Sequence, residues 1–399
     1  MEWKEVRLGD VCNIITGFPF PGKKYSQKGV RVVRGDNVTI GNLRWDTEKD
    51  KRWNEPFDKT EYYSLQANDI VIGMDGSRVG KNKARIKEED LPLLLAQRVA
   101  CVRHNELAEQ DYLYYNIFSK KFVDYVNSIH TGSAIPHISQ KQIEDYKILL
   151  PNLETQRRIA SILSSLDRKI ELNNKINADL EEMAQAIFKN WFVDFEPFKG
   201  GKFVDSELGM IPEGWKVVAF DNILKVTTTK TGKEGIPEYS VTNTGIHPRD
   251  EKFTKNLSKS SAKNKLIRKG NLVFGMSREI LNWGIMKEEI GGVSSAYNVY
   301  IVDEKIVSTT YLEYFIAQRM DYFADLIKPA SREGQGVDKA LLMKKIICIP
   351  PSEVLDVFLE KYNSIMHPTE IRNQENSRLS LLRDTLLPRL MSGELEVPE

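Results

Sequence analysis

Three segments of the chain are rich in lysine and arginine and contain no acidic residue. They are residues 11–35, residues 76–87 and residues 252–269. Cationic side chains of this kind bind the phosphates of DNA and release counterions, so such binding weakens steeply as salt is added. A solvated surface explains any single segment equally well. The occurrence of several such segments favours contact with a nucleic acid.

Two similar turns carry side chains that suit the reading of bases. Residues 73–78 read GMDGSR and residues 275–278 read GMSR, so a glycine precedes a Ser-Arg pair in both. Glycine lets the backbone approach a ligand closely, and the arginine fork can bind guanine or hold a phosphate. Asn37 and Asn243 follow strand-like segments and carry the amide that pairs with adenine, although a turn-forming role fits each equally well. The predicted DNA-binding residues are Lys23, Lys24, Tyr25, Arg34, Asn37, Ser77, Arg78, Lys81, Lys83, Lys230, Lys233, Asn243, Ser277, Arg278, Asn282 and Trp283.

Short apolar segments bounded by Gly, Asn and Asp predict the strands that would hold these turns. They are residues 30–33, 69–74, 94–102 and 147–150 in the first half of the chain, and residues 272–276, 296–302 and 345–349 in the second. Residues 111–129 and 310–327 have aromatic and aliphatic residues at helical spacing. Each of these two segments is therefore predicted to form one helix.

The segment 151–192 occurs twice in the chain, which marks a repeated structural unit. Its second copy begins at Pro350, 199 positions after Pro151, and no gap is needed to align the two. Apolar residues at steps of three, four and seven predict a helix of roughly 38 residues and about 55 Å in the first copy. Pro368 lies within the second copy and is expected to kink that helix or to divide it into two.

The apolar stripe of so long a helix needs a partner, and the second copy is the obvious one. Asn173 and Asn177 lie near this stripe, where polar residues fix the register of paired helices at some cost in stability. Two long helices in separate cores are the alternative. Both helices are nearly neutral, which argues against their lying along DNA and favours a spacer and a docking surface.

The repeat extends to the segments that precede the long helices. Trp3 is matched by Trp215, and Val99 by Val299. The predicted fold class is α+β, with two duplicated mixed α/β domains separated by two long helices that pair as an antiparallel coiled coil about a pseudo-twofold axis. The predicted parts are a first domain at 1–150, a first long helix at 151–192, a linker at 193–214, a second domain at 215–349, and a second long helix with a C-terminal tail at 350–399.

The composition is ordinary for a globular protein, with 41% hydrophobic and 28% charged residues. The chain has no run of about 18 apolar residues that would span a membrane and no apolar signal core at its start. Cys12, Cys101 and Cys348 are few and scattered, which fits a reducing, cytoplasmic location. The net charge is only +1, so DNA binding would depend on local basic patches.

The sequence predicts no catalytic or metal-ligating residue. Residues 17–24 nearly match a phosphate-binding loop, but Lys24 stands where a Ser or Thr would hold magnesium, and this disfavours nucleotide binding. The five histidines are scattered and none has zinc-ligand spacing with a cysteine pair. Motifs of a nuclease or of an amino-methyltransferase are not recognisable.

Four stretches carry a resemblance to a known family. They are LGMIPEGW at 208–215, KILLPNLETQRRIASILSSLD at 147–167, IFKNWFVDF at 187–195 and LLRDTLLPRLMSGEL at 381–395. With these stretches and the two-domain, two-helix layout, the whole chain resembles the specificity subunit of Type I restriction-modification systems.

This resemblance implies that each domain is a target-recognition domain reading one half of a bipartite site in double-stranded DNA. It implies that the helices set the unread spacer and dock two modification subunits, which methylate adenine with S-adenosylmethionine. Restriction subunits would add ATP- and magnesium-dependent translocation and cleavage. The chain itself would hold no cofactor, catalyse nothing and contact no membrane.

Three other functions are alternatives to this one. The chain could be an orphan or phage-type specificity protein that binds DNA or modification subunits without an active restriction system. A self-contained endonuclease-methyltransferase is disfavoured by the missing catalytic motifs. A coiled-coil scaffold without a nucleic-acid role would show none of the salt dependence expected of DNA binding.

Overall fold

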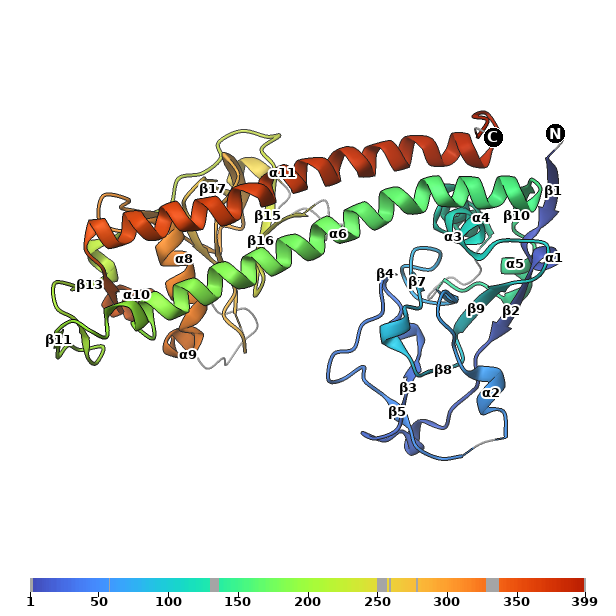
Figure 1. Ribbon diagram of the computed structural model, residues 1–399, viewed down its shortest axis with the longest axis horizontal. Helices are drawn as coiled ribbons and strands as arrows, with labels where there is room; N and C mark the ends of the chain where they lie inside the picture. Colours follow the sequence, from blue (N-terminus) through green and yellow to red (C-terminus); the bar gives the residue numbers. More distant parts are fainter. Residues whose placement is uncertain are drawn as a thin grey trace. The chain divides into compact units, whose positions relative to one another are not determined.

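The computed structural model describes residues 3–56, 58–129, 136–249, 257, 260–277, 279–327 and 337–397. The chain forms two compact units, each built from strands and helices (Figure 1). Unit 1 comprises Met1–Lys175 and Arg372–Glu399, and unit 2 comprises Ile176–Ile371. Both units therefore belong to the α+β class that the sequence predicts.

Unit 1 contains a five-stranded sheet, a three-stranded sheet and a two-stranded pair. Their orders are β2-β9-β6-β7-β4, β5-β3-β8 and β1-β10. The strands are β1 (Lys4–Arg7), β2 (Cys12–Thr16), β3 (Val30–Val33), β4 (Ile40–Gly41), β5 (Arg52–Trp53), β6 (Ile70–Gly73), β7 (Lys83–Arg85), β8 (Leu93–Leu95), β9 (Val99–His104) and β10 (Lys147–Leu150). The helices before the long one are α1 (Leu8–Val11), α2 (Thr60–Tyr63), α3 (Gln110–Phe118), α4 (Lys120–Ile129) and α5 (Gln140–Glu144).

The five-stranded sheet of unit 1 is buried on both faces. Ile70 and Ile72 of β6 join the apolar cluster formed with helices α3 and α4. Val71, which lies between them, joins the cluster formed with Val33 and Leu95 of the smaller sheet. Alternate residues of a strand point to opposite faces, so the short apolar segments of the sequence are explained by burial on two sides.

Unit 2 contains a four-stranded sheet of order β14-β21-β18-β19 and several two-stranded pairs. The strands are β11 (Phe203–Val204), β12 (Ile211–Pro212), β13 (Lys216–Ala219), β14 (Leu224–Thr227), β15 (Tyr239–Thr242), β16 (Gly245–Pro248), β17 (Lys265–Arg268), β18 (Leu272–Phe274), β19 (Trp283–Ile285), β20 (Ile290–Val293), β21 (Asn298–Val302) and β22 (Ile346–Ile349). The short helices are α8 (Thr309–Gln318), α9 (Met320–Phe323) and α10 (Lys339–Lys344). Leu272 and Phe274 again face one cluster while Val273 faces the other.

Two long helices contribute to both units, and these are α6 (Leu153–Phe192) and α11 (Ser352–Met391). Within unit 1, Ile159 of α6 and Leu390 of α11 belong to one apolar cluster. Farther along α6, Asn173 donates a hydrogen bond to Asn376 of α11 at 2.9 Å. Rising numbers on α6 therefore meet falling numbers on α11, so the two segments are antiparallel within this unit.

The long helices also meet within unit 2. Phe188 and Phe192 of α6 lie against Phe358 of α11, with ring centroids 5.7 and 4.9 Å apart. All three side chains are buried. Apolar burial at about 25 cal/mol per Å² makes such aromatic contacts a main source of stability for helices that could not fold alone.

Equivalent contacts recur inside the two units. Tyr112 donates a hydrogen bond from its hydroxyl to the carbonyl of Leu149 at 2.6 Å, and Tyr311 donates to the carbonyl of Cys348 at the same distance. The strand pair β1-β10 of unit 1 is matched by β13-β22 of unit 2. The two halves of the sequence therefore form the same local arrangement of strands and the same tyrosine hydrogen bond.

Sheet register corrects one of the predicted matches between the halves. Val102 lies opposite Ile70 in unit 1, and Tyr300 lies opposite Leu272 in unit 2. If Ile70 and Leu272 are equivalent, Val102 corresponds to Tyr300, which displaces the match of Val99 with Val299 by two residues. A displacement of two keeps each side chain on its face of the sheet, so the apolar pattern did not reveal it.

Three predicted elements are interrupted in the structure. The segment predicted as one strand at 94–102 forms β8 and β9, separated by a turn in which Arg98 has φ 69°. The segment predicted as one helix at 111–129 breaks at Ser119, whose backbone is extended and whose hydroxyl accepts a hydrogen bond from the N–H of Phe122. The predicted helix at 310–327 likewise ends at Gln318, before Arg319.

Pro368 was expected to kink the second long helix or to divide it, and division is wrong, because α11 runs without interruption from Ser352 to Met391. A proline in a helix removes one hydrogen bond and costs about 3 kcal/mol. Apolar burial on both sides of Pro368 offsets this cost, because Phe358 and Leu390 of α11 are buried in apolar clusters.

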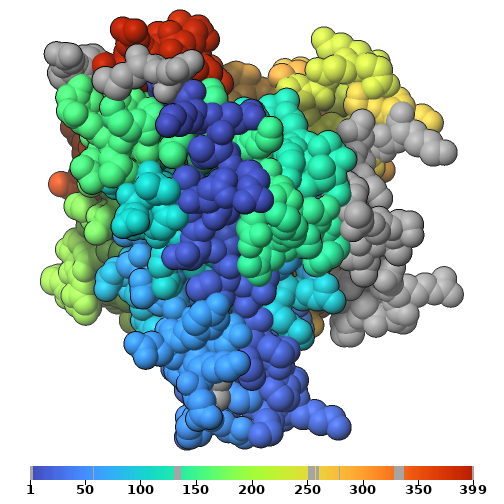
Figure 2. All heavy atoms as spheres, turned by 90° about the vertical axis from the view of Figure 1, so that its right-hand side faces the viewer, coloured from blue at the N-terminus to red at the C-terminus, as the bar shows by residue number. Residues whose placement is uncertain are grey.

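In the described part of the chain, no helix is both long enough and apolar enough to cross a membrane. Cys12, Cys101 and Cys348 are buried and free. The N-terminal and C-terminal segments share a face of unit 1, where Figure 2 shows the dark blue and red ends near one another. Trp3 packs there with Leu395 in the same apolar cluster.

Candidate nucleic-acid interface

Three turns meet at one edge of the five-stranded sheet of unit 1. The N–H of Met74, just after β6, donates to the carbonyl of Arg98, just before β9, at 2.9 Å. A Cβ added to Gly35, which follows β3, would lie 3.3 Å from a carboxylate oxygen of Asp75. Turns 34–37, 74–78 and 96–98 are therefore held together by the strands that they follow or precede.

Three arginines extend from these turns. The Arg98 side chain is 60% exposed, with its Nε 3.9 Å from the Asp75 carboxylate. The Arg34 guanidinium lies 5.7 Å from the ring centre of Tyr25 and 3.5 Å from Asp36. Arg78 is exposed and makes no ion pair with any residue that the structure describes. The name "arginine edge" is used below for Arg34, Arg78 and Arg98.

The arginine edge is flanked by other predicted contact residues. Lys23 and Lys24 are exposed in a single 3-10 turn, where Lys24 pairs with Glu55 at 2.8 Å. Tyr25 is half-buried against Trp53, and this burial raises the pKa of its phenol. The hydroxyl of Tyr25 is therefore protonated at neutral pH and can donate a hydrogen bond. Ser77 and Lys81 are exposed next to Arg78.

Two predicted contact residues of unit 1 have structural roles instead. Asn37 is fully buried, accepts a hydrogen bond from the N–H of Arg34, and donates to the carbonyls of Arg44 and Lys49. Lys83 is buried, and its ammonium donates to the carbonyl of Gly80 at 2.8 Å. In this conformation neither side chain is available to DNA.

The predicted contact residues of unit 2 likewise include both exposed side chains and buried ones with structural roles. Lys230, Lys233 and Asn243 are exposed, with Asn243 at the tip of the β15-β16 hairpin. Ser277 is buried and accepts a hydrogen bond from the N–H of Asn282 at 2.9 Å.

The other unit 2 candidates shape the turn after β18 or lie outside the described residues. The side chain of Asn282 donates to the carbonyl of Met276 at 2.6 Å, and Trp283 is buried in β19. These two residues therefore build the turn. Arg278 and residues 252–256 lie outside the described part of the chain.

Arg98 is the residue that the sequence did not single out. Its left-handed backbone, φ 69°, is costly for a residue other than glycine, and such strain concentrates at functional sites. The segment Ala-Gln-Arg lies between two apolar runs and contains neither Gly nor Pro, so no residue type there indicates a turn.

The long helices carry a second surface, made of exposed apolar residues. In unit 1 these are Leu172 of α6 and Leu382 of α11, and in unit 2 they are Ile371 of α11 and Met183 of α6. Leu172 and Ile371 are matched in the gapless repeat, and so are Met183 and Leu382. The name "helix patch" is used below for this pair in each unit. Exposed apolar side chains that recur at equivalent positions indicate a protein-binding surface.

Among the described residues, no group of three or more His, Cys, Asp or Glu side chains could hold a metal ion. Asp36 and Asp75, the carboxylates that the described residues place at the arginine edge, lie next to arginines. Arginines held on a sheet in this way are suited to binding anions.

Comparison with known proteins defines the class to which this chain belongs. Residues 1–182 match the family model described as Type I restriction modification DNA specificity domain. The chain is 31% identical over 310 residues to the Type I restriction enzyme MjaIX specificity subunit of Methanocaldococcus jannaschii, an alignment that covers 72% of this chain and 70% of that protein. It is also 24% identical over 437 residues to the MjaVIII specificity subunit of the same organism, across 99% and 93% of the two chains.

The fold resembles that of a crystal structure of a Type I restriction-modification system S subunit from M. genitalium. The TM-score is 0.52 and the identity 13%, with 98% of this chain and 96% of that chain covered. On these sequence matches, the chain belongs to the family of Type I restriction enzyme specificity subunits.

Proposed function

We propose that this chain is the DNA sequence-specificity subunit of a Type I restriction-modification enzyme and that it catalyses no reaction itself. The observation that carries the proposal is the arginine edge, where Arg34, Arg78 and Arg98 extend from turns fixed to a buried sheet. Arginine on a rigid support is suited both to holding phosphates and to reading guanine. The family membership supplies the context in which such a surface reads DNA.

Each unit reads one half of a bipartite site. Exposed Lys230, Lys233 and Asn243 are the candidates in unit 2, and Lys23, Lys24, Tyr25, Ser77 and Lys81 accompany the arginine edge in unit 1. The recurring strand pairs β1-β10 and β13-β22 support two duplicated target-recognition domains.

The long helices form an antiparallel coiled coil that relates the two domains by a pseudo-twofold axis and sets the unread spacer. Opposed numbering of the contacts between Ile159 and Leu390 and between Asn173 and Asn376 supports this arrangement. The buried asparagine fixes the register of the two helices, as polar residues do in coiled coils.

The helix patches dock two modification subunits, one on each patch. Two equivalent patches suit two identical partners. S-adenosylmethionine, ATP and magnesium are used by the modification and restriction subunits, and none is assigned to this chain.

Methylome sequencing tests the proposed function. The chain is expressed with its cognate modification subunit in a host without other adenine methylation, and methylated adenines are expected at one bipartite motif. Exchange of residues 1–150 for the first domain of a relative should change one half of that motif and leave the other. A methylome without a motif, or a change in both halves, contradicts the proposal.

A further inference from the structure

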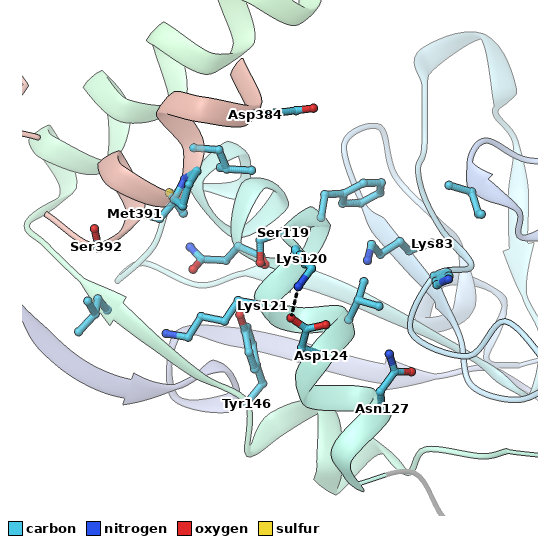
Figure 3. Close-up of a pocket in the computed structure, with 18 residues that line it drawn as sticks. Lys83, Ser119, Lys120, Lys121, Asp124, Asn127, Tyr146, Asp384, Met391 and Ser392 are labelled. Atoms are coloured by element: carbon cyan, nitrogen blue, oxygen red, sulfur yellow. Dashed lines mark hydrogen bonds and ion pairs between the residues drawn. The ribbon is translucent and has the colours of Figure 1, made fainter. Parts of the chain in front are cut away.

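Unit 1 contains a cavity of about 920 Å³ between the first domain and the last turns of α11. Figure 3 shows Lys120, Lys121 and Asp124 of α4 on one side of this cavity and Met391 of α11 on another. The lining is largely apolar and includes Phe118, Leu149, Leu387, Pro388 and Met391. Cavities of this size and composition commonly bind ligands.

The repeat explains why this space is open. In the gapless alignment, Leu387 corresponds to Phe188 and Met391 to Phe192. Phe188 and Phe192 are fully buried in the core of unit 2. Unit 1 thus has smaller aliphatic side chains where unit 2 fills its own core with aromatic rings.

Two further wall positions show the same difference. Asn116 of the cavity corresponds to Phe315, which is buried in unit 2. Lys83 lies opposite Ile72 in the sheet register, and Trp283 lies opposite Phe274 in the equivalent place. At four positions, therefore, unit 1 has a smaller or polar residue where unit 2 has an aromatic one.

The cavity is basic as well as apolar. Lys81, Lys83, Lys120 and Lys121 line it, against two carboxylates, and one of these carboxylates, Asp124, is paired with Lys120 at 3.1 Å. Lys83 is buried deep in the wall, between the rings of Phe118 and Phe122 at 5.5 and 5.2 Å. Its ammonium donates one hydrogen bond, to Gly80, and has donors left for an anion.

We propose that this cavity binds a segment of a partner protein that presents an aromatic side chain next to carboxylates. The aromatic side chain occupies the space that Phe188 and Phe192 fill in unit 2, and the carboxylates meet Lys83, Lys120 and Lys121. DNA fits this lining poorly, because phosphates would meet the exposed lysines and leave the apolar wall in water. The cavity shares Lys81 with the residues that accompany the arginine edge, but its lining includes none of Arg34, Arg78 and Arg98 and no residue of the helix patches.

Selection from a display library of random dodecapeptides tests the proposal on the full-length protein. Peptides with an aromatic residue and a net negative charge are expected to be enriched. Their affinity, measured by fluorescence anisotropy, should fall at least tenfold for Leu387→Phe with Met391→Phe, which gives the cavity the side chains of unit 2. It should also fall at least tenfold for Lys120→Glu with Lys121→Glu, two exposed changes that do not threaten folding.

Lys59→Glu is the matched control, since Lys59 is exposed in unit 1 and does not line the cavity. It should leave peptide binding unchanged. The proposal is overturned if no peptide is enriched, if enriched peptides lack acidic or aromatic residues, or if either double variant binds them as wild type does. Displacement of the peptides by duplex DNA would assign the cavity to DNA and overturn the proposal. Binding of decanoate, a fatty-acid probe, with no peptide enriched would assign the cavity to a small apolar anion and also overturn the proposal.

DNA binding by the same variants separates this inference from the proposed function. The cavity variants should bind the target duplex as wild type does. If wild type fails to bind a specific duplex but the peptides behave as expected, the proposed function fails and this inference stands.

Discussion

Asn173 of α6 is 1% exposed and donates hydrogen bonds to Asn376 of α11 at 2.9 Å and to Glu375 at 2.7 Å. Asn376 in turn donates to Asn174 at 2.8 Å. Lys169 lies 3.5 Å from Glu375 and extends this polar network toward solvent. Asn173 is the buried member, so a shift of one helix along the other is penalised because it would leave the Asn173 amide without partners.

Replacement of Asn173 by alanine should therefore destabilise the protein by about 1–3 kcal/mol, because it removes one hydrogen bond to the Asn376 amide and one to the Glu375 carboxylate. The measurement is the midpoint of urea-induced unfolding. Leu172→Ala is the control, since its side chain is 52% exposed and exposed substitutions usually change stability by less than about 0.5 kcal/mol. Equal losses in the two variants would contradict the assigned role of the network.

The helix patch of unit 1 should dock one modification subunit. Leu172→Glu with Leu382→Glu places two charges on that patch and should reduce the bound modification subunits from two to one in native mass spectrometry, because an interface does not bury unpaired charges. The equivalent change in unit 2, Ile371→Glu with Met183→Glu, should give the same result. If either variant still binds two modification subunits, the helix patches do not dock them.

Arg98→Gly should separate DNA recognition from folding. Glycine accepts φ 69° without strain, so stability should be unchanged or raised by up to about 1 kcal/mol. Loss of the guanidinium should weaken binding of the target duplex by about tenfold or more, since a good contact to a base contributes about 1–3 kcal/mol. Fluorescence anisotropy at fixed salt measures the affinity.

Asn68→Gly is the control for Arg98→Gly. Asn68 also has a positive φ, 72°, and precedes β6, whereas Arg98 precedes β9 and is bonded to Met74 at the other end of β6. This change should leave DNA affinity unaltered. If both variants bind alike, Arg98 does not contact the duplex.

The strands whose apolar runs are bounded by Gly, Asn or Asp were predictable, and the bounds of Val30–Val33 and Lys147–Leu150 agree with the prediction. A run of apolar residues and the periodicity of a long helix can each be recognised in a short window of sequence. The turn at Arg98 was not predictable, because it depends on a hydrogen bond from Met74 in a neighbouring turn rather than on Gly or Pro. The break at Ser119 was not predictable for a different reason: the Ser119 hydroxyl accepts a hydrogen bond from the N–H of Phe122, and the helical spacing of apolar residues continues across it.

The candidate site was only partly predictable for a different reason. Asn37 and Asn243 are the same residue type after similar strands, yet Asn37 is buried with its amide bonded to the backbone and Asn243 is exposed. The prediction that Lys83 contacts DNA rests on its place in the acid-free segment 76–87, and lysine is rarely buried. Which polar side chain faces inward depends on the packing of the whole unit, and a local pattern does not contain that information.

Buried Lys83 should make stability depend on pH. Burial lowers the pKa of its ammonium to about 8, while the unfolded chain keeps a value of roughly 10.4. Between these values the unfolded state binds more protons, so the free energy of unfolding should rise with pH in that window, and the full penalty of burying the charge applies below pH 8.

Lys83→Met should remove this dependence and stabilise the protein at pH 7 by about 2–3 kcal/mol, since one pKa unit corresponds to about 1.36 kcal/mol. The measurement is urea unfolding of wild type and variant at pH 7 and at pH 9.5. Burial raises the pKa of Tyr146 and Tyr300 to about 12, so unfolding also changes proton binding by tyrosines at high pH. The quantity to compare is therefore the difference between the two proteins, which should shrink as pH rises. Lys81→Met, a change at an exposed neighbour, should show no such trend. A difference that stays constant with pH would mean that Lys83 is solvated in the folded protein, and its place in the cavity wall would then have to be abandoned.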